Sequence, residues 1–142
     1  MGRTPRAGPP DEKVTVNLGP VDLGKIDLLV EEGFFGSRAD FIRSAVRRLA
    51  DDHRQVLQEA ATRREFTLGY VRQSRKSLEL ARRKKERLDI RVVGVFEIAE
   101  DVTPELAKDT LERVWVLGAL RAPAQVVSAL GPRIARNKGA GT

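Results

Sequence analysis

The stretch that decides the fold is Lys13–Leu49, KVTVNLGPVDLGKIDLLVEEGFFGSRADFIRSAVRRL, which predicts one short strand followed by two helices. Residues 13–18 alternate strictly between polar and apolar side chains, as a half-buried strand does. The apolar face consists of Val14, Val16 and Leu18, and the polar face consists of Lys13, Thr15 and Asn17. No further strand pattern follows before Ala61, so the expected partner of this strand is the same strand of a second chain.

The rest of this stretch predicts two helices. Pro20 suits a first helical turn and Gly33 suits a C-terminal stop, so the first helix is expected from about Pro20 to Glu32. Ser37 followed by Asp40 is the Asp variant of a capping box and starts the second helix. Its apolar residues keep helical spacing through His53 as far as Ala60, which predicts a long second helix.

Two antiparallel strands from two chains form a ribbon narrow enough to enter the major groove of DNA. Residues 14–49, about a quarter of the chain, resemble the ribbon-helix-helix (CopG/Arc/MetJ-type) DNA-binding family, and the run Ser37–Arg43 carries the most specific likeness. The resemblance is confined to this N-terminal part and does not extend to the second half of the chain. In that family the paired strand reads base edges and the start of the second helix clamps the DNA backbone. The resemblance therefore implies two sets of contacts. The base contacts would be Lys13, Thr15 and Asn17, and the phosphate contacts would be Gly36, Ser37 and Arg38.

Both assignments have simpler alternatives. Lys, Thr and Asn are ordinary residues on a solvated strand face, and Ser37 caps a helix whether or not it meets a phosphate. The chemistry is nevertheless suitable, because these side chains offer donors and acceptors to base edges. A helix N-terminus also presents free N–H groups and a favourable dipole to an anion.

Composition and charge are consistent with a cytoplasmic, nucleoid-associated protein. The 142 residues contain no cysteine and one histidine, so we expect no metal site, no cofactor and no catalytic centre. No segment resembles a membrane span or signal peptide, and residues 1–12 are expected to be a flexible arm. Residues 57–91 hold eleven Lys/Arg against five Asp/Glu, which accounts for the whole net charge of +6. Four of these basic residues, Arg82, Arg83, Lys84 and Lys85, form a basic cluster that is either a solvated helix face or an auxiliary phosphate contact.

The second half of the chain repeats an apolar-Gly-apolar-apolar signature. It occurs at 68–71, 93–96 and 117–120, with the glycines 25 and 24 residues apart. A helix candidate follows each one, at 74–87, 103–113 and 122–134. Such a series predicts about three strand-helix repeats, either solenoid-like or a parallel β-α layer. Its uncovered edges or faces would favour self-association.

These observations predict an α+β protein with a ribbon-helix-helix domain at 13–61, a strand-helix repeat domain at 62–135 and a disordered tail at 136–142. The expected function is a sequence-specific transcriptional regulator, in particular a repressor, that binds double-stranded DNA as a homodimer or larger homo-oligomer. One alternative is a nucleoid-organising or plasmid-partition protein that polymerises through its repeats. The other is an antitoxin whose C-terminal part wraps a toxin. The repeat domain would serve oligomerisation or effector sensing, and the sequence does not identify a small-molecule effector.

Overall fold

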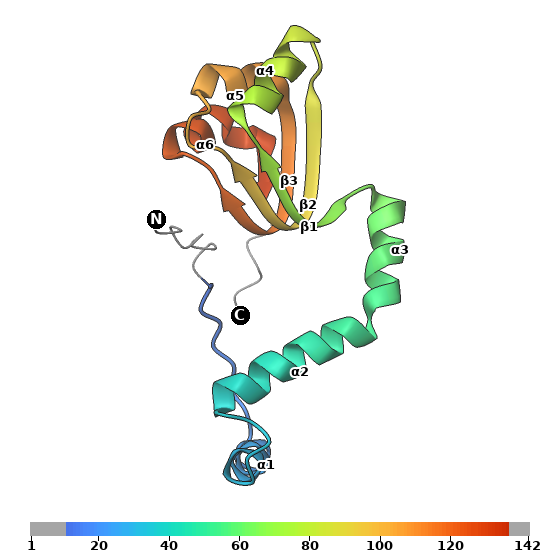
Figure 1. The fold of residues 1–142 in the computed structure, drawn as a ribbon, viewed down its shortest axis with the longest axis vertical. Coiled ribbons are helices and arrows are strands. Elements are labelled where there is room, and N and C mark those ends of the chain that lie inside the picture. The colour runs from blue at the N-terminus through green and yellow to red at the C-terminus, as the bar shows by residue number, and fades with distance from the viewer. Residues whose placement is uncertain (1–10, 137–142) are drawn as a thin grey trace, which may run out of the picture. The chain divides into compact units, whose positions relative to one another are not determined.

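The structure, a computed structural model, describes residues 11–136 and has a mixed α+β fold (Figure 1). Contacts divide the chain into two compact units, the first ending at Gln58 and the second beginning at Glu59. The division lies within α3 (Arg54–Arg64). The N-terminal arm up to residue 10 and the tail from 137 lie outside the described residues, and so do the predictions made for them.

The first unit begins with the predicted helix α1 (Pro20–Glu31). Pro20 occupies its first turn, and Ile26 is its buried residue. The helix ends as predicted, because Gly33 has φ +83° and the Gly33 and Phe34 N–H groups bond back to the carbonyls of Val30 and Leu29.

The second predicted helix is present but interrupted. It forms α2 (Arg38–Asp52), and helical structure resumes in α3 directly after His53. The break has a local cause: Nδ1 of His53 lies 2.9 Å from the Leu49 carbonyl oxygen, while its backbone N–H bonds to Ala50. Helical structure therefore continues past Ala60, as the spacing predicted, but as two helices with a break at His53.

Residues 11–19 form neither helix nor strand in the single chain, and all of them are exposed. The strand expected at 13–18 is one that forms between two chains, so it stays a prediction.

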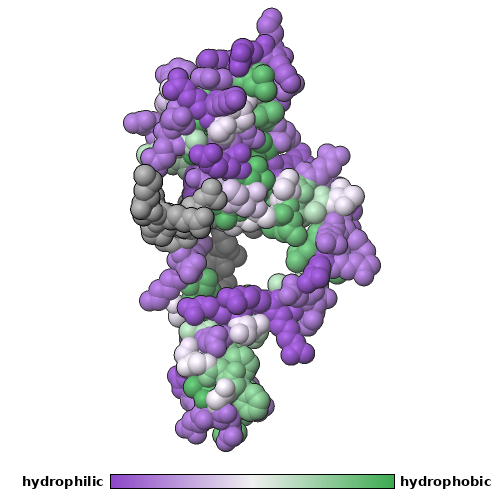
Figure 2. Space-filling model, in the orientation of Figure 1, coloured by the Kyte–Doolittle hydropathy of each residue, from purple (hydrophilic) through white to green (hydrophobic). Residues whose placement is uncertain are grey.

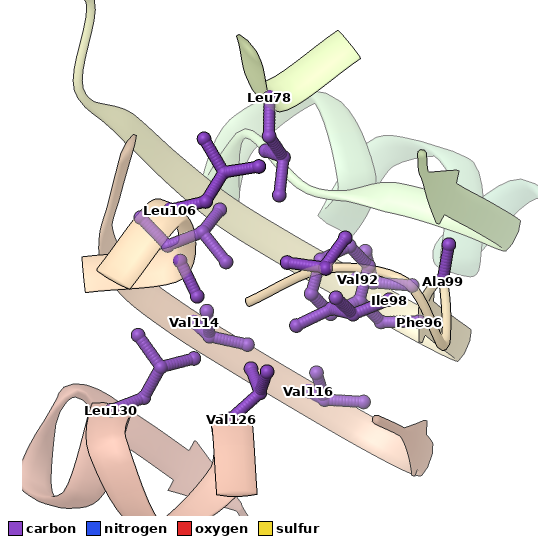
Figure 3. Close-up of a cluster of buried hydrophobic side chains, with 13 residues drawn as sticks. Leu78, Val92, Phe96, Ile98, Ala99, Leu106, Val114, Val116, Val126 and Leu130 are labelled. Atoms are coloured by element: carbon purple, nitrogen blue, oxygen red, sulfur yellow. The ribbon is translucent and has the colours of Figure 1, made fainter. Parts of the chain in front are cut away.

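The second unit is a parallel sheet in the order β1-β2-β3-β4, covered by helices on one face (Figure 1). Its elements in chain order are β1 (Thr67–Gln73), α4 (Arg75–Arg83), β2 (Leu88–Ile98), α5 (Pro104–Thr110), β3 (Leu111–Arg121), α6 (Ala124–Leu130), a 3₁₀ turn (Gly131–Arg133) and β4 (Ile134–Arg136). The core between sheet and helices includes Leu78, Phe96, Leu106, Val116 and Leu130 (Figure 3). Of the two predicted arrangements, the parallel β-α layer is confirmed.

The three repeat glycines stand side by side in the sheet. Gly69 pairs with Gly94, and Gly94 pairs with Gly118. Their φ values are +128°, +134° and +118°, which L-residues rarely adopt. A Cβ on Gly94 would lie 2.1 Å from the Gly69 carbonyl oxygen, and one on Gly118 would lie 2.2 Å from that of Gly94. The 25- and 24-residue spacing of the glycines thus places them side by side on adjacent strands, at points where the neighbouring backbones leave no room for a Cβ.

The repeat helices are shorter than predicted. α4 ends at Arg83, because Lys85 adopts φ +56° and the Glu86 N–H bonds back to the Ala81 carbonyl. α5 ends at Thr110, because Leu111 already pairs with Leu88 of the neighbouring strand. The third predicted helix ends at Leu130, and the residues after it form the 3₁₀ turn and a fourth strand that the sequence pattern did not predict.

Candidate nucleic-acid interface

The three predicted base-contacting residues lie on an exposed segment whose apolar side is also uncovered. Lys13, Thr15 and Asn17 are solvent-exposed. Val14 and Val16, which alternate with them, are 77% and 68% exposed. Hydrophobic side chains this exposed form an apolar surface that one chain alone leaves in contact with water.

An apolar groove of about 710 Å³ runs between this segment and the two helices. Its apolar lining consists of Val14, Val16, Leu18, Ile26, Phe41, Ile42, Ala45 and Val46. In the described part of the first unit, Ile26 is the single buried hydrophobic residue, and α2 contributes none. Figure 2 shows hydrophobic residues at the surface of this unit. In a single chain, therefore, the apolar side chains of this unit line an open groove and do not form a buried core.

The start of α2 is closed by two reciprocal hydrogen bonds. The Asp40 N–H donates to Oγ of Ser37 at 3.1 Å, and the Gly36 N–H donates to Oδ2 of Asp40 at 3.0 Å. The predicted capping role of Ser37 is confirmed. Gly36, by contrast, already has its N–H occupied by a carboxylate, whereas the first-turn amides of Arg38 and Ala39 have no intrahelical partner.

Arg38 ties the two helices together through Asp27, a residue that the sequence analysis did not single out. Its Nε and Nη2 donate to the two carboxylate oxygens of Asp27, both at 2.7 Å. This hydrogen bonding lowers the pKa of Asp27 and raises the pKa of Arg38. The guanidinium is thus committed to α1, and a phosphate would have to share or displace that bond. No sequence spacing marks the pair, because it joins separate helices.

The basic cluster lies at and just after the end of α4 in the second unit, and all four of its residues are exposed. Arg82 approaches Asp109 at 3.9 Å, a distance at which an exposed ion pair is weak. The cluster therefore keeps most of its charge available to a polyanion.

The face of the sheet opposite α4–α6, here called the outer face, carries apolar residues in two cross-strand rows. One row is Leu68, Val93 and Leu117, and the other is Tyr70, Val95 and Ala119. Leu68 and Tyr70 are 47% and 57% exposed. Beside these rows, the Tyr70 hydroxyl donates to Glu97, which also lies 3.9 Å from Arg72. Parallel sheets are normally covered on both faces, so this surface is an unusual one to leave in water.

Two further properties bear on the class of protein. Within residues 11–136, no helix is long and apolar enough to cross a membrane. In the same part of the chain, no three His, Cys, Asp or Glu residues gather in a way that could hold a metal ion.

The comparison with protein families gives the class. Residues 9–127 match the Ribbon-Helix-Helix transcriptional regulator family, and the chain belongs to that family. The match covers most of the chain, so the expectation that the resemblance ends with the N-terminal part was wrong: it includes β1–β3 and most of α6. Membership implies DNA-binding transcriptional regulation and no enzymatic activity. No curated protein and no solved structure matches the chain significantly.

Proposed function

We propose that the protein is a sequence-specific transcriptional repressor that binds DNA as a homodimer, with a ribbon made from residues 13–18 of two chains in the major groove. The observation that carries this proposal is the uncovered apolar groove of the first unit. An open apolar groove favours a partner that presents a matching apolar surface, and a second copy of the chain presents the same surface by two-fold symmetry.

The energetics favour a dimer. Val14, Val16 and Val46 are 77%, 68% and 63% exposed in one chain. Burying such a side chain fully contributes about 1.5–3 kcal/mol. Several of them per chain, counted twice in a dimer, are enough to stabilise helices that bury almost nothing alone.

If the two strands pair edge to edge through backbone hydrogen bonds and their apolar side chains pack against the helices, the polar side chains remain on the outer surface of the ribbon. Lys13, Thr15 and Asn17 then offer an ammonium, a hydroxyl and an amide to base edges. Ser37, Arg38 and Gly36 would contact the flanking phosphates, with the amides of the first turn of α2 as the principal donors. Of these three, the available N–H of Arg38 supports the contact best, since that of Gly36 is occupied.

The test is a footprint of the full-length protein on the DNA upstream of its own coding sequence. We expect a short protected site with two-fold symmetry, which persists when random competitor DNA is added. Protection that spreads along the fragment without a preferred site would contradict the repressor assignment. The matched control is Val16→Asp, which places a charge in the shared core and should abolish protection.

The uncovered outer face favours a second candidate function. We infer that the second unit self-associates through the two apolar rows, because a dimer held by the first unit keeps another copy at high effective concentration. If this contact joins successive dimers, the protein would organise the nucleoid or act in plasmid partition, with the cytoplasmic location that either role requires. Spreading protection would support that role. The antitoxin alternative is not favoured, because the second unit is a folded domain with its own core.

A further inference from the structure

A pocket of about 270 Å³ lies on the outer face of the sheet, near the amino-terminal ends of its strands. Its lining residues are Arg64, Arg91, Arg113 and Trp115. All four belong to the second unit. The pocket is therefore a feature of that unit alone, and nothing in the DNA-binding proposal uses it.

The parallel register of the sheet builds this pocket. Arg91 pairs with Trp115, and Asp89 pairs with Arg113 on the adjoining strand. Their neighbours Val114 and Val116 are buried under the helices, so Arg113 and Trp115 point to the outer face.

The end of α3 completes the pocket. The guanidinium carbon of Arg64 lies 5.2 Å from the centre of the Trp115 ring, within cation–π range. The ring of Phe66 lies 6.0 Å from the same indole. Nη1 of Arg91 donates to the Arg64 carbonyl oxygen at 3.3 Å, which holds this segment against the sheet.

The charges around the pocket are not balanced. Asp89 is the carboxylate that meets the arginines, 3.3 Å from Arg91 and 4.0 Å from Arg113. Within residues 11–136, Arg64 makes no ion pair. Three guanidinium groups against one carboxylate leave an excess of two positive charges beside an aromatic ring. Such an excess attracts an anion, whose binding would relieve the repulsion among the arginines.

We propose that this pocket binds a nucleotide. Arginine guanidinium groups match phosphate oxygens with paired hydrogen bonds, and an indole offers a flat face on which a base stacks. The pocket volume, about 270 Å³, is just below the range of small-molecule sites, which begins at about 300 Å³, so the pocket would hold only part of one nucleotide. Arg113, 62% exposed, and Arg91, 37% exposed, would meet the phosphates, and Trp115 would meet the base.

The protein provides its own reporter for this proposal. Trp115 is the single tryptophan of the sequence, so tryptophan emission reports the pocket alone. The full-length protein is titrated with ATP without divalent cations, with excitation at the red edge of tryptophan absorption, where adenine does not absorb. Tripolyphosphate and adenosine are titrated separately as probes of charge and of stacking. We expect saturable quenching by ATP, weaker binding of tripolyphosphate and the weakest binding of adenosine.

Arg113→Gln is the variant of choice, because within residues 11–136 the Arg113 side chain makes no hydrogen bond to neighbouring backbone, so the fold should survive its loss. It should weaken ATP binding about tenfold, as expected for one charge-assisted hydrogen bond. The matched control is Arg75→Gln, an exposed arginine of α4 that is paired with Glu79 and lies outside the pocket. The control should bind ATP like the unchanged protein.

Three results would overturn the proposal. The first is the absence of saturable quenching by ATP, or equal effects of Arg113→Gln and Arg75→Gln. The second is tripolyphosphate binding as tight as ATP binding, which would make the pocket an anion site without base recognition. The third is quenching by duplex DNA but not by ATP at equal phosphate concentration, which would make it a DNA-backbone contact.

Discussion

Replacing Gly94 by alanine should destabilise the second unit more than almost any other single-methyl change. Gly94 has φ +134°, and an added Cβ would lie 2.1 Å from the Gly69 carbonyl oxygen. The backbone strain alone costs about 1–3 kcal/mol. The clash is with backbone, so β1 and β2 must separate locally, which loses hydrogen bonds worth about 0.5–1.5 kcal/mol each. We therefore expect a total loss of about 3–5 kcal/mol in the free energy of unfolding.

The chain contains a matched control for the clash. Gly69 has nearly the same backbone conformation, φ +128°, but a Cβ there meets nothing within 4 Å. Gly69→Ala should therefore cost the strain alone, about 1–3 kcal/mol. Gly118→Ala should behave like Gly94→Ala, because its Cβ would lie 2.2 Å from the Gly94 carbonyl oxygen.

Urea unfolding followed by Trp115 emission measures these differences, since Trp115 lies in the second unit and is the single tryptophan. The midpoint for Gly94→Ala should fall well below that for Gly69→Ala, with an unchanged slope. Equal midpoints for the two variants would refute the stacked-glycine account.

Three further predictions concern other parts of the chain. Val16→Asp in the full-length protein should abolish the dimer formed by the first unit, because it buries an unpaired charge, and sedimentation of dilute protein should show the loss. Replacing all four residues of the basic cluster with glutamine should weaken binding to all DNA sequences about equally and reduce the slope of log affinity against log salt concentration. Arg38→Ala should change that slope less. An unchanged slope for the cluster variant would mean that the cluster is a solvated surface. The lowered pKa of Asp27 predicts a small contribution to stability that is present above the ordinary carboxyl pKa and is lost as the pH falls through the lowered pKa. In urea unfolding measured at a series of pH values, Asp27→Asn should therefore show a smaller fall of the midpoint at acid pH than the unchanged protein.

Local signals predicted the helix boundaries where the chemistry is local. Pro20, Gly33 and Ser37 each act on their own turn, and the structure confirms all three. The glycine spacing also predicted the parallel layer, because equal spacing brings equivalent backbone positions together in register.

The features that the sequence did not reveal depend on tertiary contacts. α5 ends early because Leu111 pairs with a strand that begins more than twenty residues before it. β4 is only three residues long, too short to show a period. The Asp27–Arg38 pair and the pocket around Trp115 each join separate elements, and only the register of the fold brings them together. One part of the pocket could have been predicted from the sequence: the alternation of side chains along β2 and β3 places Arg91 and Trp115 on the outer face.

The central claim, that the polar face of a shared strand reads DNA bases, is tested most directly by the ratio of operator affinity to random-DNA affinity for Thr15→Ala and Asn17→Ala. Each lost contact should cost about 1–3 kcal/mol of discrimination, counted twice in a symmetric dimer. We predict that the ratio falls by at least about thirtyfold for each variant, while dimerisation and affinity for random DNA stay nearly unchanged. An unchanged ratio in both variants would contradict the account.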